Sequence, residues 1–251
     1  MVPLQDVVDF CDKLLSVNEF RDYDRAHNGL QIENSGTIWK IAAAVDGSIG
    51  SMEAAIGCGA NLLIVHHGLF WDNHIALVGR NYRKFQVPLA HDLAVYAAHL
   101  PLDCHGEIGN NASLLRLLSL KKCGEVIEKR HDFPMPVGDG GGIGRKSFSA
   151  KVLEHFPKAI SMEYGPDSIG RVLVCSGGGG SSIASLQMID FDTVITGEAP
   201  QHFFNFAVEN GLNAYICGHH ATEVFGVKNL AAAAAEKFSL PWQFIDDSCP
   251  L

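Results

Sequence analysis

The sequence predicts an α/β protein in which helices pack against sheets. Short apolar runs rich in β-branched residues alternate with helical patterns along the chain, and four of these runs end in His, Asp or Glu. The composition, 47% hydrophobic and 19% charged, is typical of a globular protein. The 251 residues leave room for one large domain or two medium ones, each with a substantial core.

The first half of the chain opens with an amphipathic pattern. Asp6, Asp9 and Asp12 recur among apolar residues over positions 1–17, which predicts a surface helix and not a secretion signal. A β-α-β-α rhythm follows, and Asn110 and Asn111 are the expected caps of its last helix. We expect strands at 39–46, 61–67 and 94–98, and helices at 48–60 and 109–120.

The second half begins with a stretch rich in Pro and Gly, residues 131–145, which we interpret as an internal boundary or long connection. This places the predicted domains at 1–130 and 131–251. The same rhythm then resumes, which is consistent with an ancient duplication. We expect helices at 149–157, 200–211 and 222–239, and strands at 170–175, 191–198, 212–220 and 241–246.

Charge and cysteine content exclude several classes of protein. The formal net charge of -9 disfavours nucleic acid and anionic membranes as partners, although a local basic patch would leave nucleic acid open. Seven Cys, an odd number without a C-x-x-C spacing, argue against a disulfide framework or a thiolate zinc site. Reduced thiols, and the lack of an apolar run of about 18 residues, lead us to expect a cytoplasmic protein that is not bound to a membrane.

Four predicted strands end in residues that carry chemistry. Ligands bind outside the carboxyl ends of strands in open α/β sheets, so we expect these ends to converge on a pocket. The residues at the four ends are His66 and His67, His99 and Asp103, Glu198 and His202, and His219 and Glu223.

Imidazole and carboxylate without thiolate favour a metal site. These ligands suit Zn, Fe, Mn, Co or Ni and do not select one of them. His219 and Glu223 lie one helical turn apart, and Asp103 could bridge two ions through its two oxygens. A pair of ions is the usual arrangement for activating water.

Each of these positions also has an alternative interpretation. A single His at a strand end is often capped or solvated, and Glu198 and His202 could lie on an ordinary helix surface. Neighbours on an extended strand point in opposite directions, so His66 and His67 would need a turn after Val65, which Gly68 permits.

The glycine run at residues 177–180 follows a predicted strand and precedes a helix. Its backbone N–H groups could hold a phosphate. The run lacks the Gly-Lys-Ser/Thr ending of a P-loop, and a tight turn between strand and helix is an equal alternative.

Taken together, the short sequence words of this chain resemble those of the Nif-three-like family, often labelled type 2 GTP cyclohydrolase homologues. The words occur in the family's order from about residue 27 to 226, and the length is similar to that of the compact bacterial members. They are NGLQIE, AAAVDGS, LLIVHHGLFW, AAHLPLD with GNN, GIGR, VCSGGGG, TGEAPQH and GHHATE.

The resemblance implies two similar α/β domains with a dinuclear metal site in the cleft between them, and a ring-shaped homohexamer built as a trimer of dimers. It places two divalent ions per subunit, with Asp103 as the bridging ligand. His99, Glu198 and His202 match positions near the metals, where side chains orient ligands or transfer protons. The implied metal ligands are His66, His67, Asp103, His219 and Glu223.

The family label implies a function as well. The first hypothesis is a metal-dependent hydrolase that acts on a purine nucleotide or a related small molecule, by opening the GTP imidazole ring, with Glu198 or His202 moving the proton. The second is a metal-binding, metal-delivery or scaffold protein without turnover. The third is a ring used in protein interaction or regulation; DNA threading through such a ring is opposed by the net charge.

Overall fold

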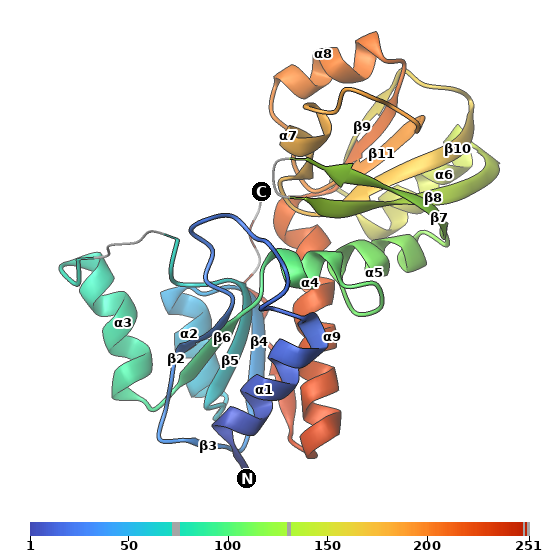
Figure 1. The fold of residues 1–251 in the computed structure, drawn as a ribbon. Helices are drawn as coiled ribbons and strands as arrows, with labels where there is room; N and C mark the ends of the chain where they lie inside the picture. The colour runs from blue at the N-terminus through green and yellow to red at the C-terminus, as the bar shows by residue number, and fades with distance from the viewer. Residues whose placement is uncertain (72–75, 130–131, 248, 250–251) are drawn as a thin grey trace. The chain divides into compact units, whose positions relative to one another are not determined.

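The computed structural model describes residues 1–71, 76–129, 132–247 and 249, and it divides the chain into two compact units. The first unit contains Met1–Leu102 and Val224–Asp247, and the second contains Asp103–Glu223. The chain therefore passes between units within two helices, α4 (Leu100–Cys104) and α9 (His219–Phe238). Both units combine a sheet with helices, so the predicted α/β class and two-domain arrangement are confirmed (Figure 1).

This division differs from the predicted boundary between residues 130 and 131, a position that lies outside the described residues. The Pro/Gly-rich stretch is not a connection, and that prediction is wrong. It forms strand β8 (Phe133–Gly144), which pairs antiparallel with β7 (Lys121–Glu128). Gly138 fits this role because a side chain there would meet the side chains of Leu115 and Leu120.

The first unit contains a five-stranded sheet in the order β13-β4-β5-β6-β2. Strands β13, β4, β5 and β6 run parallel, and β2 is an antiparallel edge. Strands β1 and β3 pair antiparallel with each other and form a separate two-stranded sheet. The bounds are β1 (Val2–Pro3), β2 (Gly29–Ile32), β3 (Thr37–Ile38), β4 (Ile41–Asp46), β5 (Leu62–His67), β6 (Ala94–Ala97) and β13 (Trp242–Phe244).

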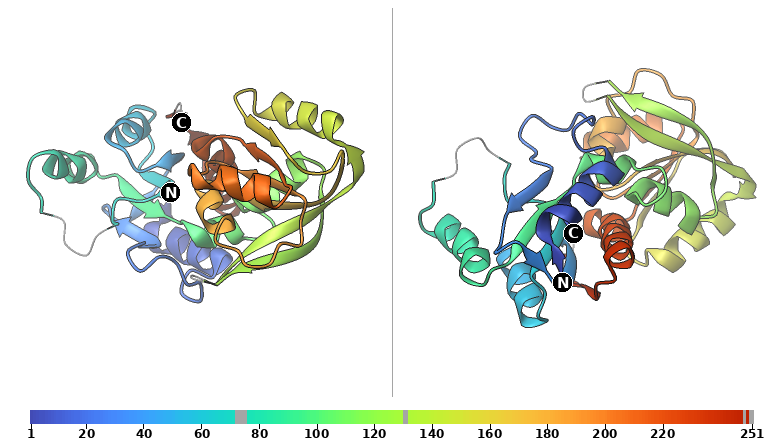
Figure 2. Two further views of the ribbon diagram at one scale, coloured as in Figure 1. Left: turned by 90° about the horizontal axis from the view of Figure 1, so that it is seen from above. Right: turned by 60° about the horizontal axis from the view of Figure 1, so that its bottom comes forward.

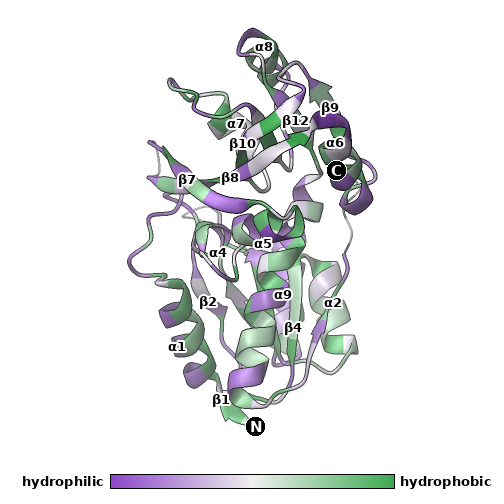
Figure 3. Cartoon of the chain, turned by 90° about the vertical axis from the view of Figure 1, so that its right-hand side faces the viewer, coloured by the Kyte–Doolittle hydropathy of each residue, from purple (hydrophilic) through white to green (hydrophobic). Residues whose placement is uncertain are grey.

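Helices cover both faces of this sheet, which is why its central strands are apolar on both sides. Helices α2 (Ile49–Gly57) and α3 (Arg80–Ala90) lie on one face, and α1 (Leu4–Leu15) and α9 lie side by side on the other (Figures 1 and 2). Figure 3 shows hydrophobic and hydrophilic residues alternating along α1, as an amphipathic surface helix requires. Helix α2 begins at a capping box, in which the Ser48 side chain accepts from the Ser51 N–H.

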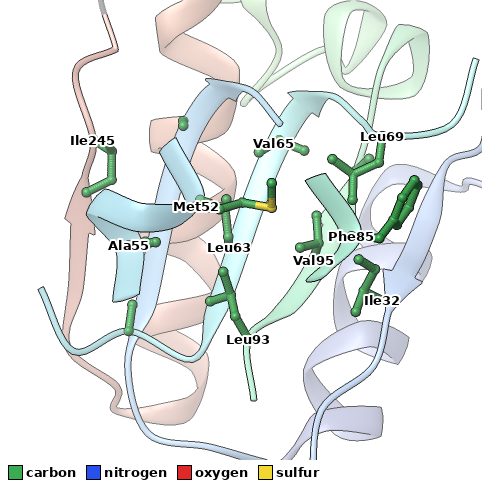
Figure 4. Packing of buried hydrophobic residues seen from close by; sticks show 14 residues of the cluster. Ile32, Met52, Ala55, Leu63, Val65, Leu69, Phe85, Leu93, Val95 and Ile245 are labelled. Carbon is green, nitrogen blue, oxygen red and sulfur yellow. The ribbon is translucent and has the colours of Figure 1, made fainter. Parts of the chain in front are cut away.

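The core beneath α2 and α3 is formed by one continuous cluster of apolar side chains (Figure 4). Met52 and Ala55 of α2 lie over Leu63 and Val65 of β5, and the ring of Phe85 closes the end nearest β2. This packing fixes the position of β5, the strand that carries His66 and His67.

The second unit contains a six-stranded sheet in the order β7-β8-β10-β11-β12-β9. Its central strands β10, β11 and β12 are parallel, and the others are antiparallel to their neighbours. Phe148 of α6 packs against Tyr215 of β12, with ring centroids 5.5 Å apart. The bounds are α5 (Asn110–Leu117), α6 (Arg145–His155), β9 (Ile160–Glu163), β10 (Ser168–Cys175), α7 (Gly179–Ile183), β11 (Thr193–Thr196), α8 (His202–Glu209) and β12 (Asn213–Ile216).

Among the described residues, no helix is both long enough and apolar enough to cross a membrane.

The core cluster supplies a test of this packing. Met52→Ala should lower the free energy of unfolding by about 2–5 kcal/mol, because the side chain is fully buried and its removal leaves a cavity. Urea unfolding followed by tryptophan fluorescence measures this, since the three Trp of the chain, at positions 39, 71 and 242, all belong to the first unit.

Met188→Ala is the matched control, because Met188 is 84% exposed. This substitution should change the free energy of unfolding, followed by circular dichroism, by no more than about 0.5 kcal/mol. Equal losses in the two variants would contradict the packing described for α2.

Candidate metal centre

Three imidazoles gather at the carboxyl ends of β5 and β6 in the first unit. We call His66, His67 and His99 the imidazole cluster. The ring centroid of His66 lies 4.7 Å from that of His67 and 5.0 Å from that of His99, and the last two are 5.8 Å apart. One ring nitrogen from each residue falls within 4.8 Å of the others, so the cluster could hold a metal ion.

Each ring of the cluster has its Nδ1 held by an oxygen acceptor. The Nδ1 of His66 lies 2.8 Å from the Ala98 carbonyl oxygen, and the Nδ1 of His67 lies 2.8 Å from Asp46 Oδ1. His99 Nδ1 lies 2.9 Å from Asp22 Oδ1. Because an oxygen acceptor requires Nδ1 to carry the proton, the neutral form of each ring has its lone pair on Nε2. This tautomer is the one that binds a metal through Nε2.

The sequence predictions missed Asp22, the residue that orients His99. Its carboxylate is buried and also accepts from the Asn28 amide and the Leu100 N–H. Burial alone would raise the pKa of Asp22, but the hydrogen bond and charge of His99 and the Asn28 amide hold it below its usual value. The available signal was the polar run that precedes the NGLQIE word, and it points to no particular partner.

His66 and His67 come together without a turn after Val65, so the expectation that they would need one is wrong. Strand β5 continues in register with β4 through His67, and the rings approach each other although they bond to opposite neighbours, Ala98 beyond β6 and Asp46 of β4. Gly68 has a different role. A side chain there would collide with the amide of Gln31, which accepts from the Leu69 N–H at 2.6 Å.

The second unit brings together Asp103, Glu223 and His219, which we call the carboxylate cluster. Asp103 and Glu223 are buried, and a carboxylate oxygen of one lies within 4.8 Å of an oxygen of the other. His219 Nε2 lies 3.1 Å from Glu223 Oε1, one turn along α9 as predicted. Two buried carboxylates at this distance repel each other, so they favour a bound cation or a proton.

His219 lies between two carboxylates. Its Nδ1 is 3.3 Å from Glu198 Oε1, on the loop after β11, while its Nε2 faces Glu223. Burial lowers the pKa of this imidazole, but the hydrogen bond and charge of Glu223, and then those of Glu198, raise it to about 9. Without a metal, the ring is therefore an imidazolium at neutral pH.

Amide and hydroxyl groups position Asp103. Its Oδ1 accepts from Asn110 Nδ2 at 2.8 Å and from the Ser176 hydroxyl at 2.9 Å, and Asn111 Oδ1 accepts in turn from the Ser176 N–H. The prediction that Asn110 and Asn111 cap α5 is wrong, because the N-cap is Gly109 and no side chain caps it. Asn110 donates directly to the buried carboxylate of Asp103, and Asn111 holds Ser176, the second donor.

Three of the four N–H groups of the glycine run already donate within the protein, that of Gly179 to the Ser176 carbonyl. The N–H of Gly177 donates to the Thr222 hydroxyl, and that of Gly180 donates to the Glu198 carbonyl. A side chain at Gly179 would meet Cys175 and Thr196. Gly177, with φ of +55°, leaves room for Glu223 and His219, which a side chain there would strike. Of the two alternatives, the structure supports the tight turn.

Glu198 and His202 separate in the structure. Glu198 has a side chain that is 59% exposed and contacts His219. His202, the first residue of α8, is exposed and lines a surface hollow with Gln201, Phe204 and Asn205. Among the described residues, His202 is not part of any group that could hold a metal ion.

The donor set of the two clusters fits a divalent metal ion with nitrogen and oxygen ligands. Cys175 lies near the carboxylate cluster but stays a thiol, because burial and then the charges of Asp103 and Glu223 raise its pKa.

The amino-acid sequence of this chain is similar to those of known proteins. A family model described as Duf34/NIF3 (NGG1p interacting factor 3) matches residues 2–250. The chain belongs to this family. It is 38% identical over 237 residues to a Deinococcus radiodurans protein named GTP cyclohydrolase 1 type 2 homolog, covering 89% of this chain and 86% of that one.

A second relative shares this name, and two solved structures share the fold. An Escherichia coli K12 protein of the same name is 37% identical over 226 residues, covering 89% of this chain and 90% of that one. The crystal structure of TTHA1606 from Thermus thermophilus superposes with a TM-score of 0.89 at 32% identity and full coverage of both chains. Protein ybgI, whose structure is titled as of unknown function, gives the same values.

The charge on His219 predicts how stability depends on pH in metal-free protein. Because the folded pKa of about 9 lies above the ordinary value of 6.5, the stabilisation is complete below about pH 6.5 and is lost as pH rises through 9. After removal of metal by chelation, the melting temperature should fall by several degrees between these pH values.

His219→Gln is the control, because it removes the titrating group. Its melting temperature should change less over the same interval, and Glu198→Gln should be intermediate. A wild-type profile that matches the His219→Gln profile would contradict the pKa described for His219.

Proposed function

We propose that this protein is a metal-dependent hydrolase that acts on a purine nucleotide, such as GTP, or on a related small molecule. One observation carries the proposal. In the imidazole cluster, Nδ1 of each ring is held by an oxygen acceptor, which is the second contact that metal-binding histidines make. The name shared by relatives, GTP cyclohydrolase 1 type 2 homolog, supports the substrate class.

We propose that His66, His67, Asp103, His219 and Glu223 would hold two divalent ions, with Asp103 shared between them. When bound, such ions supply Lewis acidity for hydrolysis. The clusters contribute donors of the required kind, neutral imidazole nitrogens and buried carboxylate oxygens.

The remaining residues would handle protons and orientation. Glu198 is exposed to solvent and contacts His219 Nδ1, so it can exchange protons with water and with that ring. His99 has its ring fixed by Asp22, and its Nε2 can accept a proton at a defined position. His202 is exposed on α8, and we propose for it a contact with substrate or solvent only.

Metal binding without turnover is a second candidate. His66 is 0% exposed, and Asp103 and Glu223 are also buried. Closed ligands of this kind suit the retention or delivery of an ion as well as they suit catalysis.

We also propose that the chain assembles as a homohexamer, a trimer of dimers. Exposed apolar side chains of the second unit, such as those of Ile160 and Phe204, support self-association. Sedimentation should give about six times the chain mass of 27.1 kDa. A monomer at micromolar concentration would contradict this assembly.

Turnover of a nucleotide panel tests the leading proposal. Protein freed of metal and reloaded separately with Zn, Mn, Fe, Co or Ni should convert at least one member, GTP included, to product. Asp103→Asn should abolish the product, because it removes the bridging charge. Asp190→Asn, the same change at a side chain that is 81% exposed, should leave turnover unchanged.

The outcomes separate the two candidates. Product that depends on metal and on Asp103 supports the hydrolase. No product from protein shown to hold two ions per chain contradicts nucleotide hydrolysis and favours metal binding without turnover.

Asp46 provides a test that needs no substrate. Asp46→Asn should weaken metal affinity about 10–100-fold, because the ring of His67, one of the proposed ligands, loses the carboxylate that fixes its orientation. Competition with a fluorescent chelator measures the affinity, with Asp190→Asn as the control. Unchanged affinity in Asp46→Asn would show that His67 does not bind the metal.

A further inference from the structure

A cavity of about 190 Å³ lies in the second unit between α5 and the strands β7 and β8, which Figure 1 shows side by side. None of the residues assigned to metal lines it. The lining residues with polar or charged groups that face a ligand include His105, Arg116 and Lys122, and Ala112 of α5 lines the cavity as well.

The floor of the cavity is apolar and well packed. Leu115, Leu120 and Pro136 are buried, and Pro134 is partly buried. The absence of a side chain at Gly138 lets Leu115 and Leu120 lie directly against β8. An apolar floor of this kind favours an occupant with a hydrophobic body.

The rim is cationic in a chain whose net charge is -9. Arg116 donates to the Glu107 carbonyl oxygen at 2.6 Å and to the Ser113 hydroxyl at 3.0 Å, so neutral acceptors fix the guanidinium without cancelling its charge. Lys122 pairs with Glu125 at 2.8 Å, but both side chains are about half exposed. Such a surface pair is weak, and an anion in the cavity can compete for the ammonium group.

His105 adds a hydrogen-bond donor. Its Nδ1 accepts from the N–H groups of Glu107 and Ile108, both at 3.2 Å. The proton of the neutral ring is therefore on Nε2, which can donate to an oxygen acceptor. Two cationic side chains and one hydrogen-bond donor surround the apolar floor. This arrangement favours a ligand whose polar end carries several hydrogen-bond acceptors.

We propose that this cavity binds a small organic anion, a carboxylate or phosphate group on a compact apolar body. The cavity, about 190 Å³ in volume, suits a small ligand, and none of the residues assigned to metal lines it. The site stands whether or not the protein is a hydrolase.

Isothermal titration calorimetry on the full chain tests the proposal with three probes. Benzoate and phenylphosphonate carry the two anionic heads on one apolar ring, and benzamide is the neutral counterpart. We expect at least one anion to bind, and benzamide to bind about tenfold more weakly or not at all. The anion that binds better identifies the head group.

Variants locate the binding. Arg116→Gln should weaken anion affinity about tenfold or more, because a charge-assisted contact is lost. Arg83→Gln is the matched control, since Arg83 lies on α3 of the other unit with a side chain 66% exposed, and it should bind as wild type does. Arg116 also holds the Glu107 carbonyl, so Ala112→Leu, which fills the cavity without changing charge, serves as an independent variant.

Three results would overturn the proposal: no binding of either anion at millimolar concentration, equal binding of benzamide and benzoate, or undiminished binding in Ala112→Leu. Binding that is selective for an anion and lost in both Arg116→Gln and Ala112→Leu would establish the site.

Discussion

Burying an imidazole at the end of a parallel strand is costly unless one ring nitrogen finds an acceptor, and this constraint organises the first unit. His66 and His67 end β5, and their acceptors come from the chain just beyond β6 and from the last residue of β4. The acceptors are available because Asp46 of β4 lies opposite His67, and Ala97, the residue before Ala98, lies opposite Val65. The packing of α2 fixes the position of β5, and this position determines which oxygen faces the Nδ1 of each histidine. The packing therefore also determines which ring nitrogen carries the proton.

The same constraint acts on carboxylates in the second unit. Asp103 is stabilised in burial by an amide and a hydroxyl, and Glu223 by the imidazolium of His219. Gly177 makes this possible by its missing side chain. The protonation states of the groups in the two clusters are thus determined by neighbouring hydrogen-bond donors and acceptors of the protein itself, independently of any bound ion.

Much of the fold could be predicted from apolar periodicity, because β4, β5, β10, β11 and β12 are buried on both faces and read as continuous apolar runs. The strand β8 could not, since its Pro and Gly residues are breakers by propensity and pair only because β7 and β10 flank them. His219 and Glu223 follow from helical spacing. Asp22 and Ser176 do not, because their partners lie 77 and 73 residues away.

The way the chain passes between units has a consequence for its synthesis. All strands of the second unit lie in one continuous segment, Asp103–Glu223, so they are complete once residue 223 has been made. The first unit must wait for β13, which pairs with β4 across about 200 residues of chain. On the ribosome, β4 therefore emerges early with one edge exposed and is covered last. Because Asp103–Glu223 interrupts the first unit, the unit that is translated first is the last to be completed.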